Sequence, residues 1–132
     1  MPPEILKSIR SMPVSYTHLM MNDSIEYSVT FSKNVRDIPN FKSIKEIKVE
    51  FALFSEKQIQ NASIVLAIDG PDGKSLHWTG DNVIGKENEW TNFTKVFPLE
   101  GSYIDNSSIL KIFVWNKEKE VFYLDDLNIV FK

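Results

Sequence analysis

The chain has 132 residues, a formal net charge of −3, 42% hydrophobic residues and 25% charged residues. This length fits one domain, and the composition excludes an intrinsically disordered or membrane-embedded chain. The slightly acidic balance, without a long run of Lys or Arg, argues against DNA or RNA as a partner. Because the chain contains no Cys, disulfides, thiolate metal sites and a Cys nucleophile are excluded.

The opening of the chain predicts a short helix or a linker over residues 1–14, followed by a single domain over residues 15–132. Ile5, Ile9 and Met12 have helical spacing, and Pro13 would end the pattern. The opening lacks the apolar region of a signal peptide, and no stretch approaches the length of a transmembrane helix. These features fit either a cytosolic protein or a domain of a longer exported protein, and we favour the second.

Residues 25–31 and 47–53 alternate apolar and polar side chains, as strands with one buried and one solvent-facing side do. In the first segment the apolar positions are Ile25, Tyr27, Val29 and Phe31. Segments rich in β-branched or aromatic residues predict further strands at 62–69, 75–79, 90–97, 110–116 and 121–131.

Turn-forming residues separate these strands. Residues 69–73 combine Asp, Gly and Pro, which predicts a hairpin between the flanking strands. Residues 116–120 form a second polar loop before the last strand. About eight short strands without helical crossovers predict an all-β fold, an antiparallel two-sheet β-sandwich of jelly-roll type, with the short helix or linker at its N-terminus.

The last predicted strand changes phase at Asp125 and Asp126. Apolar residues fall on Phe122 and Leu124 before this pair and on every second residue from Leu127 after it, and this slip of one position predicts a β-bulge. A carboxylate held against a core needs a cation or backbone N–H groups to satisfy it. Asp125 and Asp126 are therefore candidate ligands of a structural Ca²⁺ ion, and the alternative is that they accept hydrogen bonds that stabilise the strand.

Trp78, Trp115 and Tyr123 are the candidate carbohydrate-binding residues. Sugars lay their C–H faces on exposed aromatic rings while polar side chains hydrogen-bond the hydroxyls. Trp115 shares its strand face with Phe113, opposite the apolar positions, which predicts that it lies away from the main core. Trp78 is expected beside a polar loop at residues 80–82. Since large aromatic residues also pack in cores and on sheet faces, a structural role is the alternative for each of them.

No catalytic residue is identified. Nucleophile and phosphate-binding glycine motifs are absent, and His18 and His77 lie far apart and outside metal-binding patterns. Most Asp and Glu residues fall at turns or at outward strand positions, which is typical of a solvated surface and not of the paired carboxylates of a glycosidase. The sequence therefore predicts a protein that is not an enzyme.

Three segments of the C-terminal half carry a family resemblance. They are a Trp-led strand at 89–97 (EWTNFTKVF), the strand at 110–116 (LKIFVWN) and the closing segment at 122–127 (FYLDDL). In their order and spacing they resemble galactose-binding-like β-sandwich domains, which include many bacterial non-catalytic carbohydrate-binding modules. The resemblance implies a β-sandwich that binds sugars in an extracytoplasmic setting: the cell surface, the periplasm or the medium.

The resemblance also bears on calcium. In relatives that bind the ion, an aspartate of the closing segment joins acidic residues near the N-terminus, which implies a role for Asp125 or Asp126. The chain departs from the family pattern at the other end, because residues 1–24 carry only Glu4 and Asp23 as acids and lack an Asn-x-x-Phe-Glu-like opening.

Two functions follow as hypotheses. The first is a non-catalytic carbohydrate-binding module of a larger exported or cell-envelope bacterial protein, and an exposed row of aromatic rings beside polar side chains would favour it. The alternative is a structural or protein-interaction domain that contacts another surface protein and has no sugar site. A flat charged face with every Trp buried would favour that alternative. In either case the isolated domain is expected to be monomeric.

Overall fold

The computed structural model describes residues 11–13, 19–22, 27 and 31–132, and every statement on the fold refers to them. These residues contain nine strands and three short 3₁₀ helices, and none of the helices is long and apolar enough to cross a membrane. The strands are β1 (Ser11–Pro13), β2 (Leu19–Met21), β3 (Phe31–Asn34), β4 (Glu46–Ser55), β5 (Ile59–Asp69), β6 (Ser75–Gly85), β7 (Glu89–Pro98), β8 (Ile109–Asn116) and β9 (Phe122–Phe131). The 3₁₀ helices are η1 (Val35–Asp37), η2 (Phe41–Ser43) and η3 (Gly101–Tyr103).

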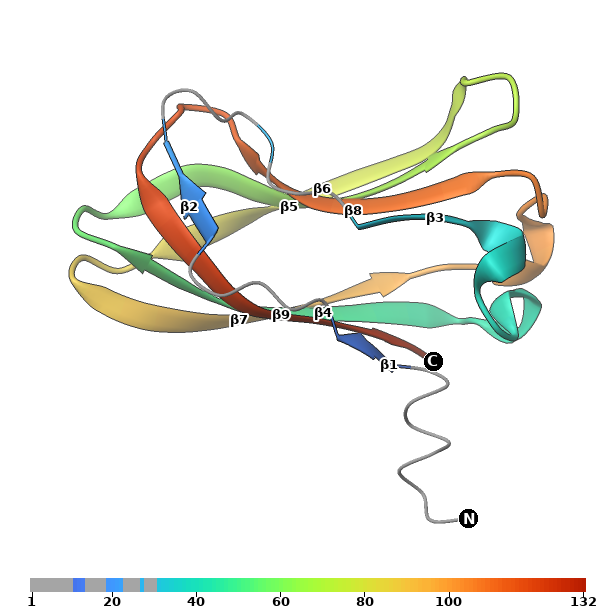
Figure 1. Cartoon of the computed structure of the whole chain (residues 1–132), viewed down its shortest axis with the longest axis horizontal. Coiled ribbons are helices and arrows are strands. Elements are labelled where there is room, and N and C mark those ends of the chain that lie inside the picture. The colour runs from blue at the N-terminus through green and yellow to red at the C-terminus, as the bar shows by residue number, and fades with distance from the viewer. Residues whose placement is uncertain (1–10, 14–18, 23–26, 28–30) are drawn as a thin grey trace, which may run out of the picture.

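The strands form two antiparallel sheets that lie face to face (Figure 1). The five-stranded sheet has the order β1-β9-β4-β7, and β2 also pairs with β9; the four-stranded sheet has the order β3-β8-β5-β6. Only β5 and β6 are consecutive partners within one sheet among the strands from β3 to β9, and every other connection there crosses between the sheets. This crossing pattern confirms the predicted all-β sandwich of jelly-roll type.

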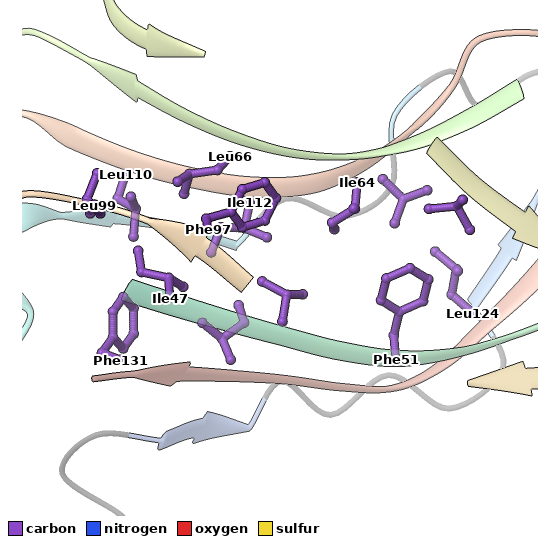
Figure 2. Packing of buried hydrophobic residues seen from close by; sticks show 14 of the residues in the cluster. Ile47, Phe51, Ile64, Leu66, Phe97, Leu99, Leu110, Ile112, Leu124 and Phe131 are labelled. Atoms are coloured by element: carbon purple, nitrogen blue, oxygen red, sulfur yellow. The ribbon is translucent and has the colours of Figure 1, made fainter. Parts of the chain in front are cut away.

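The core lies between the two sheets and is filled by every second residue of the long strands. Ile47 and Phe51 point inward from β4, and Leu66 and Ile112 meet them from β5 and β8 (Figure 2). Phe97 of β7 is buried in the same cluster. Burying a side chain of this kind contributes roughly 1.5–3 kcal/mol, so the alternation read from the sequence decides which face of each strand turns inward.

The β-bulge predicted at the acidic pair is confirmed. Glu50 of β4 pairs with Asn128 and Ala52 pairs with Asp125, so β9 has one residue more than β4 between these two pairs. Asp126 takes up the extra length with a φ of 55°. Its backbone N–H donates to the carboxylate of Asp125 at 2.9 Å. This bond is of the kind expected when an aspartate stabilises the strand.

Asp126→Val should destabilise the fold by about 1–2 kcal/mol, because a β-branched side chain is strained at positive φ. Asp126→Asn should unfold like the parent protein, since Asn tolerates this conformation. Urea denaturation followed by circular dichroism measures both changes. A Val variant as stable as the parent would show that the bulge does not hold residue 126 in the left-handed region.

The β5–β6 hairpin is confirmed at the predicted turn. The N–H of Gly70 donates to the carbonyl of Lys74 at 2.8 Å, and the N–H of Gly73 donates to the carbonyl of Gly70 at 2.9 Å. Gly73 has a φ of 82°, which a residue with a Cβ rarely adopts. The tip of the hairpin bends away from the five-stranded sheet (Figure 1).

Two assignments made from the sequence are wrong in part. Residues 80–82, expected as a loop, belong to β6 and pair with residues 63–65 of β5. Ser11–Pro13, expected within a helix or linker over 1–14, forms β1 and pairs with β9, while the rest of that segment lies outside the described residues. Most of the strand predicted at 25–31 also lies outside them, and only Tyr27 and Phe31 can be compared.

Candidate functional site

The outer surface of the four-stranded sheet carries a cluster of aromatic side chains, as the alternation in β8 predicted for Trp115. Leu110, Ile112 and Val114 face the core, so Phe113 and Trp115 face outward on the other side of the same strand. The expectation that Trp115 lies away from the main core is thus confirmed.

Four rings make up this cluster, which we call the aromatic face: Tyr27, Trp78, Phe113 and Trp115. Trp115 stacks on Tyr27 with ring centroids 6.3 Å apart and meets Trp78 edge-on at 6.0 Å. Phe113 contacts Tyr27 edge-on at 5.5 Å. Trp78 is 52% exposed and Tyr27 is 51% exposed, so the rings contact each other and still present surface to solvent.

A glycine beneath the Trp78 ring lets this ring lie close to the sheet. Trp78 and Trp115 come from β6 and β8, which are not neighbours, because β5 lies between them. The Trp78 ring leans over Gly80, where an added Cβ would lie only 3.2 Å from the ring. Val65 of β5 pairs with Gly80 of β6 and with Phe113 of β8. It is completely buried, although its side chain is on the outer side of the sheet. The rings therefore cover the middle of the sheet as a continuous apolar surface.

Polar and charged groups border the aromatic face. Lys117 places its Nζ 5.4 Å from the centroid of the Trp115 ring, a distance typical of a cation–π contact. Lys111 of β8 and Trp78 of β6 both pair with Ala67 of β5, on its two sides. Lys111 forms an ion pair of 2.8 Å with Asp69. Asn82 is exposed, and it pairs with Ser63 of β5, which pairs with Trp115 on its other side. The arrangement combines flat rings with hydrogen-bonding groups at their edges.

Tyr123, the third candidate carbohydrate-binding residue, lies in the other sheet. It belongs to β9 and pairs with Phe54 of β4, with ring centroids 6.5 Å apart. Phe54 in turn contacts Trp90 of β7 at 5.5 Å. The structure therefore brings two of the three predicted residues together and places the third in a separate group of rings.

Sequence reasoning missed Tyr27 as part of the site. Its alternation with Phe31 placed it on the buried side of a strand, but Tyr27 is opposite Trp115 while Phe31 is opposite Ile112. The register differs by one residue between these two pairs, so Tyr27 lies on the outer side. The alternation of residues 25–31 gives no sign of this shift.

The calcium expectation at Asp125 and Asp126 stays a prediction. Within the described residues, no group of three or more His, Cys, Asp or Glu side chains is arranged to hold a metal ion. Glu4 and Asp23, the N-terminal acids that the family resemblance would draw in, lie outside those residues.

Two carboxyl groups near the ends and edges of the sandwich titrate away from their ordinary range. Asp81 of β6 accepts a hydrogen bond from Lys95 of β7, with a separation of 3.0 Å, and this contact lowers the pKa of Asp81. In the β8–β9 loop, burial raises the pKa of Glu120, and the nearby Glu118 adds to the increase. The Asp81–Lys95 ion pair links the two sheets at an edge. The carboxyl group of Glu120 is partly desolvated at one end of the sandwich.

Glu120→Gln should raise the melting temperature at pH 7 and change it little at pH 4. The pKa of Glu120 in the folded protein lies above its ordinary value of 4.5, so the folded state binds the proton more tightly than the unfolded state. The folded protein is therefore destabilised as the pH rises through the pKa of Glu120, and it stays destabilised at pH 7. Gln carries no charge at either pH, so the variant does not lose this stability. Thermal unfolding at both pH values tests this, and a lower melting temperature of the variant at pH 7 would contradict it.

Comparison with known proteins identifies the fold. No protein-family model matches the chain, and no curated protein matches it in sequence. Among solved structures, a CBM4 structure superposes with a TM-score of 0.52 at 13% identity, over 92% of this chain and 71% of that one. The CBM22-1–CBM22-2 tandem domain of Paenibacillus barcinonensis Xyn10C gives a TM-score of 0.52 at 12% identity, over 76% of this chain and 30% of that one.

The same architecture also occurs in other settings. The structure of infectious bursal disease virus, Gx strain, gives a TM-score of 0.50 at 14% identity, over 92% of this chain and 32% of that one. Likeness at this level of identity shows the fold alone, because unrelated functions share sandwiches of this type. The chain has the fold of a carbohydrate-binding-module-type β-sandwich.

Proposed function

We propose that this chain is a non-catalytic carbohydrate-binding module that holds a saccharide chain on its aromatic face. The observation that carries the proposal is the Trp78 ring, half exposed, supported over Gly80 and in contact with Trp115. Such rings match the C–H faces of sugars, and their exposure costs little because each also packs on a neighbour.

The border of the aromatic face suits the hydroxyl groups of a sugar. Lys111 supplies a hydrogen-bond donor and Asp69 an acceptor beside Trp78. The side-chain amide of Asn82, on the same line across the sheet as Trp115, supplies both a donor and an acceptor. Ligand sites are typically apolar surfaces with a small number of placed polar groups, which is the composition here.

The charges near the rings support binding without catalysis. Glycosidases need two carboxyl groups placed on either side of the scissile bond. Asp69 forms an ion pair with Lys111, and Asp81, on the same edge strand as Trp78, forms one with Lys95. Both acids are thus engaged by lysines, and this proposal gives neither of them a catalytic role.

We place the module in an exported or cell-envelope protein, since extracellular polysaccharides are the ligands that such a surface fits. The chain covers 30% of the length of the CBM22 tandem structure and 71% of the CBM4 structure, and a parent protein of several domains is part of the proposal. The alternative of a structural or protein-interaction domain would be favoured by buried Trp side chains. Trp78 and Trp90 are 52% and 44% exposed, which favours sugar binding.

Native gel electrophoresis in the presence of soluble polysaccharides tests the proposal. The probes are xylan, mixed-linkage β-glucan, galactomannan, arabinan and pectic galactan, each added to the gel. We expect at least one of them to retard the protein, and retardation to be reduced when Trp78 is changed to Ala. If no probe retards the protein, or if Trp78→Ala is retarded as strongly as the parent, the aromatic face is not a sugar site.

A further inference from the structure

One end of the sandwich contains a cavity that is separate from the aromatic face. It lies between the β4–β5 and β8–β9 loops and has a volume of about 570 Å³. This volume falls within the range of about 300–1,000 Å³ that is usual for small-molecule sites. The cavity is lined by Glu56, Lys57, Gln58, Ile59, Lys119, Glu120, Val121 and Tyr123.

Two buried polar side chains fix the walls of this cavity. The hydroxyl of Ser55, which is 1% exposed, accepts from the N–H of Lys57 at 3.1 Å and donates to the carbonyl of Val121 at 3.2 Å. It thereby ties the two lining loops to each other. Asn116, equally buried, accepts from the N–H of Glu120 at 2.9 Å and donates to its carbonyl at 2.8 Å. Walls held in this way need little reordering when a ligand binds.

The lining offers a ring, apolar surface and balanced charge. Tyr123 contributes the aromatic ring, which packs against Phe54. Val121, which is 55% exposed, contributes apolar surface. The charged lining residues are Glu56, Lys57, Lys119 and Glu120, so the two negative and two positive charges cancel. A site with no net charge and many donors and acceptors fits a neutral polyhydroxyl ligand better than an anion or a cation.

We infer that this end cavity is a second carbohydrate site, for a neutral saccharide, with Tyr123 as its stacking ring. The inference rests on the proposed function and extends it by giving the module two sites, one on the outer surface of the four-stranded sheet and one at an end of the sandwich. It assigns Tyr123 a ligand-binding role apart from Trp78 and Trp115. Two sites on one module would strengthen attachment to a polymer that reaches both, because the second contact forms at high effective concentration.

Titration of the ¹⁵N-labelled protein with oligosaccharides, followed by NMR, tests this inference. The probes are neutral oligomers of xylose, glucose, mannose and galactose, with an oligogalacturonate as the anionic comparison. The backbone amides of Lys57, Gln58 and Glu120 report on the end cavity, and the indole N–H of Trp78 reports on the aromatic face. Each titration is repeated with Trp78→Ala and with Tyr123→Ala.

We expect a neutral oligomer to shift the cavity amides saturably, with the shifts retained in Trp78→Ala and lost in Tyr123→Ala. Gln58→Ala, an exposed substitution that leaves the strands intact, should weaken the same shifts at least several-fold and serves if Tyr123→Ala does not fold. Tyr103→Ala, which changes an exposed tyrosine in η3, should bind like the parent.

Different outcomes separate the two proposals. Shifts at the Trp78 indole without shifts at the cavity amides would overturn the second site and leave the proposed function standing. Shifts at the cavity amides alone would support the second site and count against the aromatic face. Cavity shifts that are stronger with oligogalacturonate, or unchanged by Tyr123→Ala and Gln58→Ala, would overturn the neutral saccharide site.

Discussion

Replacing Trp78 by Ala should weaken binding of the recognised polysaccharide by about tenfold or more. The ring is half exposed and lies at the edge of the aromatic face, so a ligand resting on this surface loses its flattest contact. Truncation of a Trp that anchors a ligand typically costs about 1–2 kcal/mol or more, and 1.4 kcal/mol corresponds to a factor of ten in affinity. Isothermal titration calorimetry measures the change.

The matched control is Tyr103→Ala, because Tyr103 is a more exposed aromatic residue, at 83%, and belongs to neither group of rings. Its affinity should equal that of the parent. Trp78→Ala should also lower the melting temperature moderately, because the ring packs over Gly80 and against Trp115, so the affinities of all variants are compared at a temperature well below their unfolding transitions. Equal losses of affinity in both variants would mean that exposed aromatic residues contribute without regard to position, against the assignment of a site.

Gly101→Ala should destabilise the protein by about 3 kcal/mol, the upper end of the usual cost of overpacking. Gly101 begins η3, and its N–H donates to the carbonyl of Ile44 at 3.1 Å. A Cβ at this position would overlap the backbone carbonyl oxygen of Phe41. Because Phe41 is buried in the core, its backbone cannot move aside without disturbing the packing of η2 against η3.

Urea denaturation monitored by Trp fluorescence measures this loss of stability. Ser102→Ala, at the exposed neighbouring position, should stay within about 0.5 kcal/mol of the parent, as most surface substitutions do. If Gly101→Ala were as stable as Ser102→Ala, the close approach of η2 and η3 would not exist in solution.

The long strands could be predicted because their burial follows a simple period. β4 and β8 each bury alternate residues, so the pattern of side chains reports directly which face meets the core. The β-bulge in β9 was readable for the same reason, since Asp126 shifts the period by one residue. Residues 80–82 were misread because Gly, Asp and Asn are poor strand formers. In the structure Gly80 is paired with Val65 and covered by Trp78, and these tertiary contacts outweigh its local preference.

The candidate site could be predicted only one strand at a time. The outward position of Trp115 follows from the alternation in β8, but its contact with Trp78 depends on β5 lying between β6 and β8. Tyr123 was a third candidate, and its place in the other sheet could not be predicted because periodicity does not say which sheet a strand joins. The end cavity was not predicted at all, since it is formed by two loops tied through the hydroxyl of Ser55.

The most direct test of the central claim is the response of the Trp78 and Trp115 indole N–H signals when the retarding polysaccharide, or an oligomer cut from it, is titrated into ¹⁵N-labelled protein. With three Trp residues in the chain, the signals are assigned by single Trp→Phe variants. Binding on the aromatic face predicts that the signals of Trp78 and Trp115 shift together and saturate at the same ligand concentration. Indole signals of both residues that stay in place while calorimetry records binding would contradict the claim and place the sugar elsewhere on the domain.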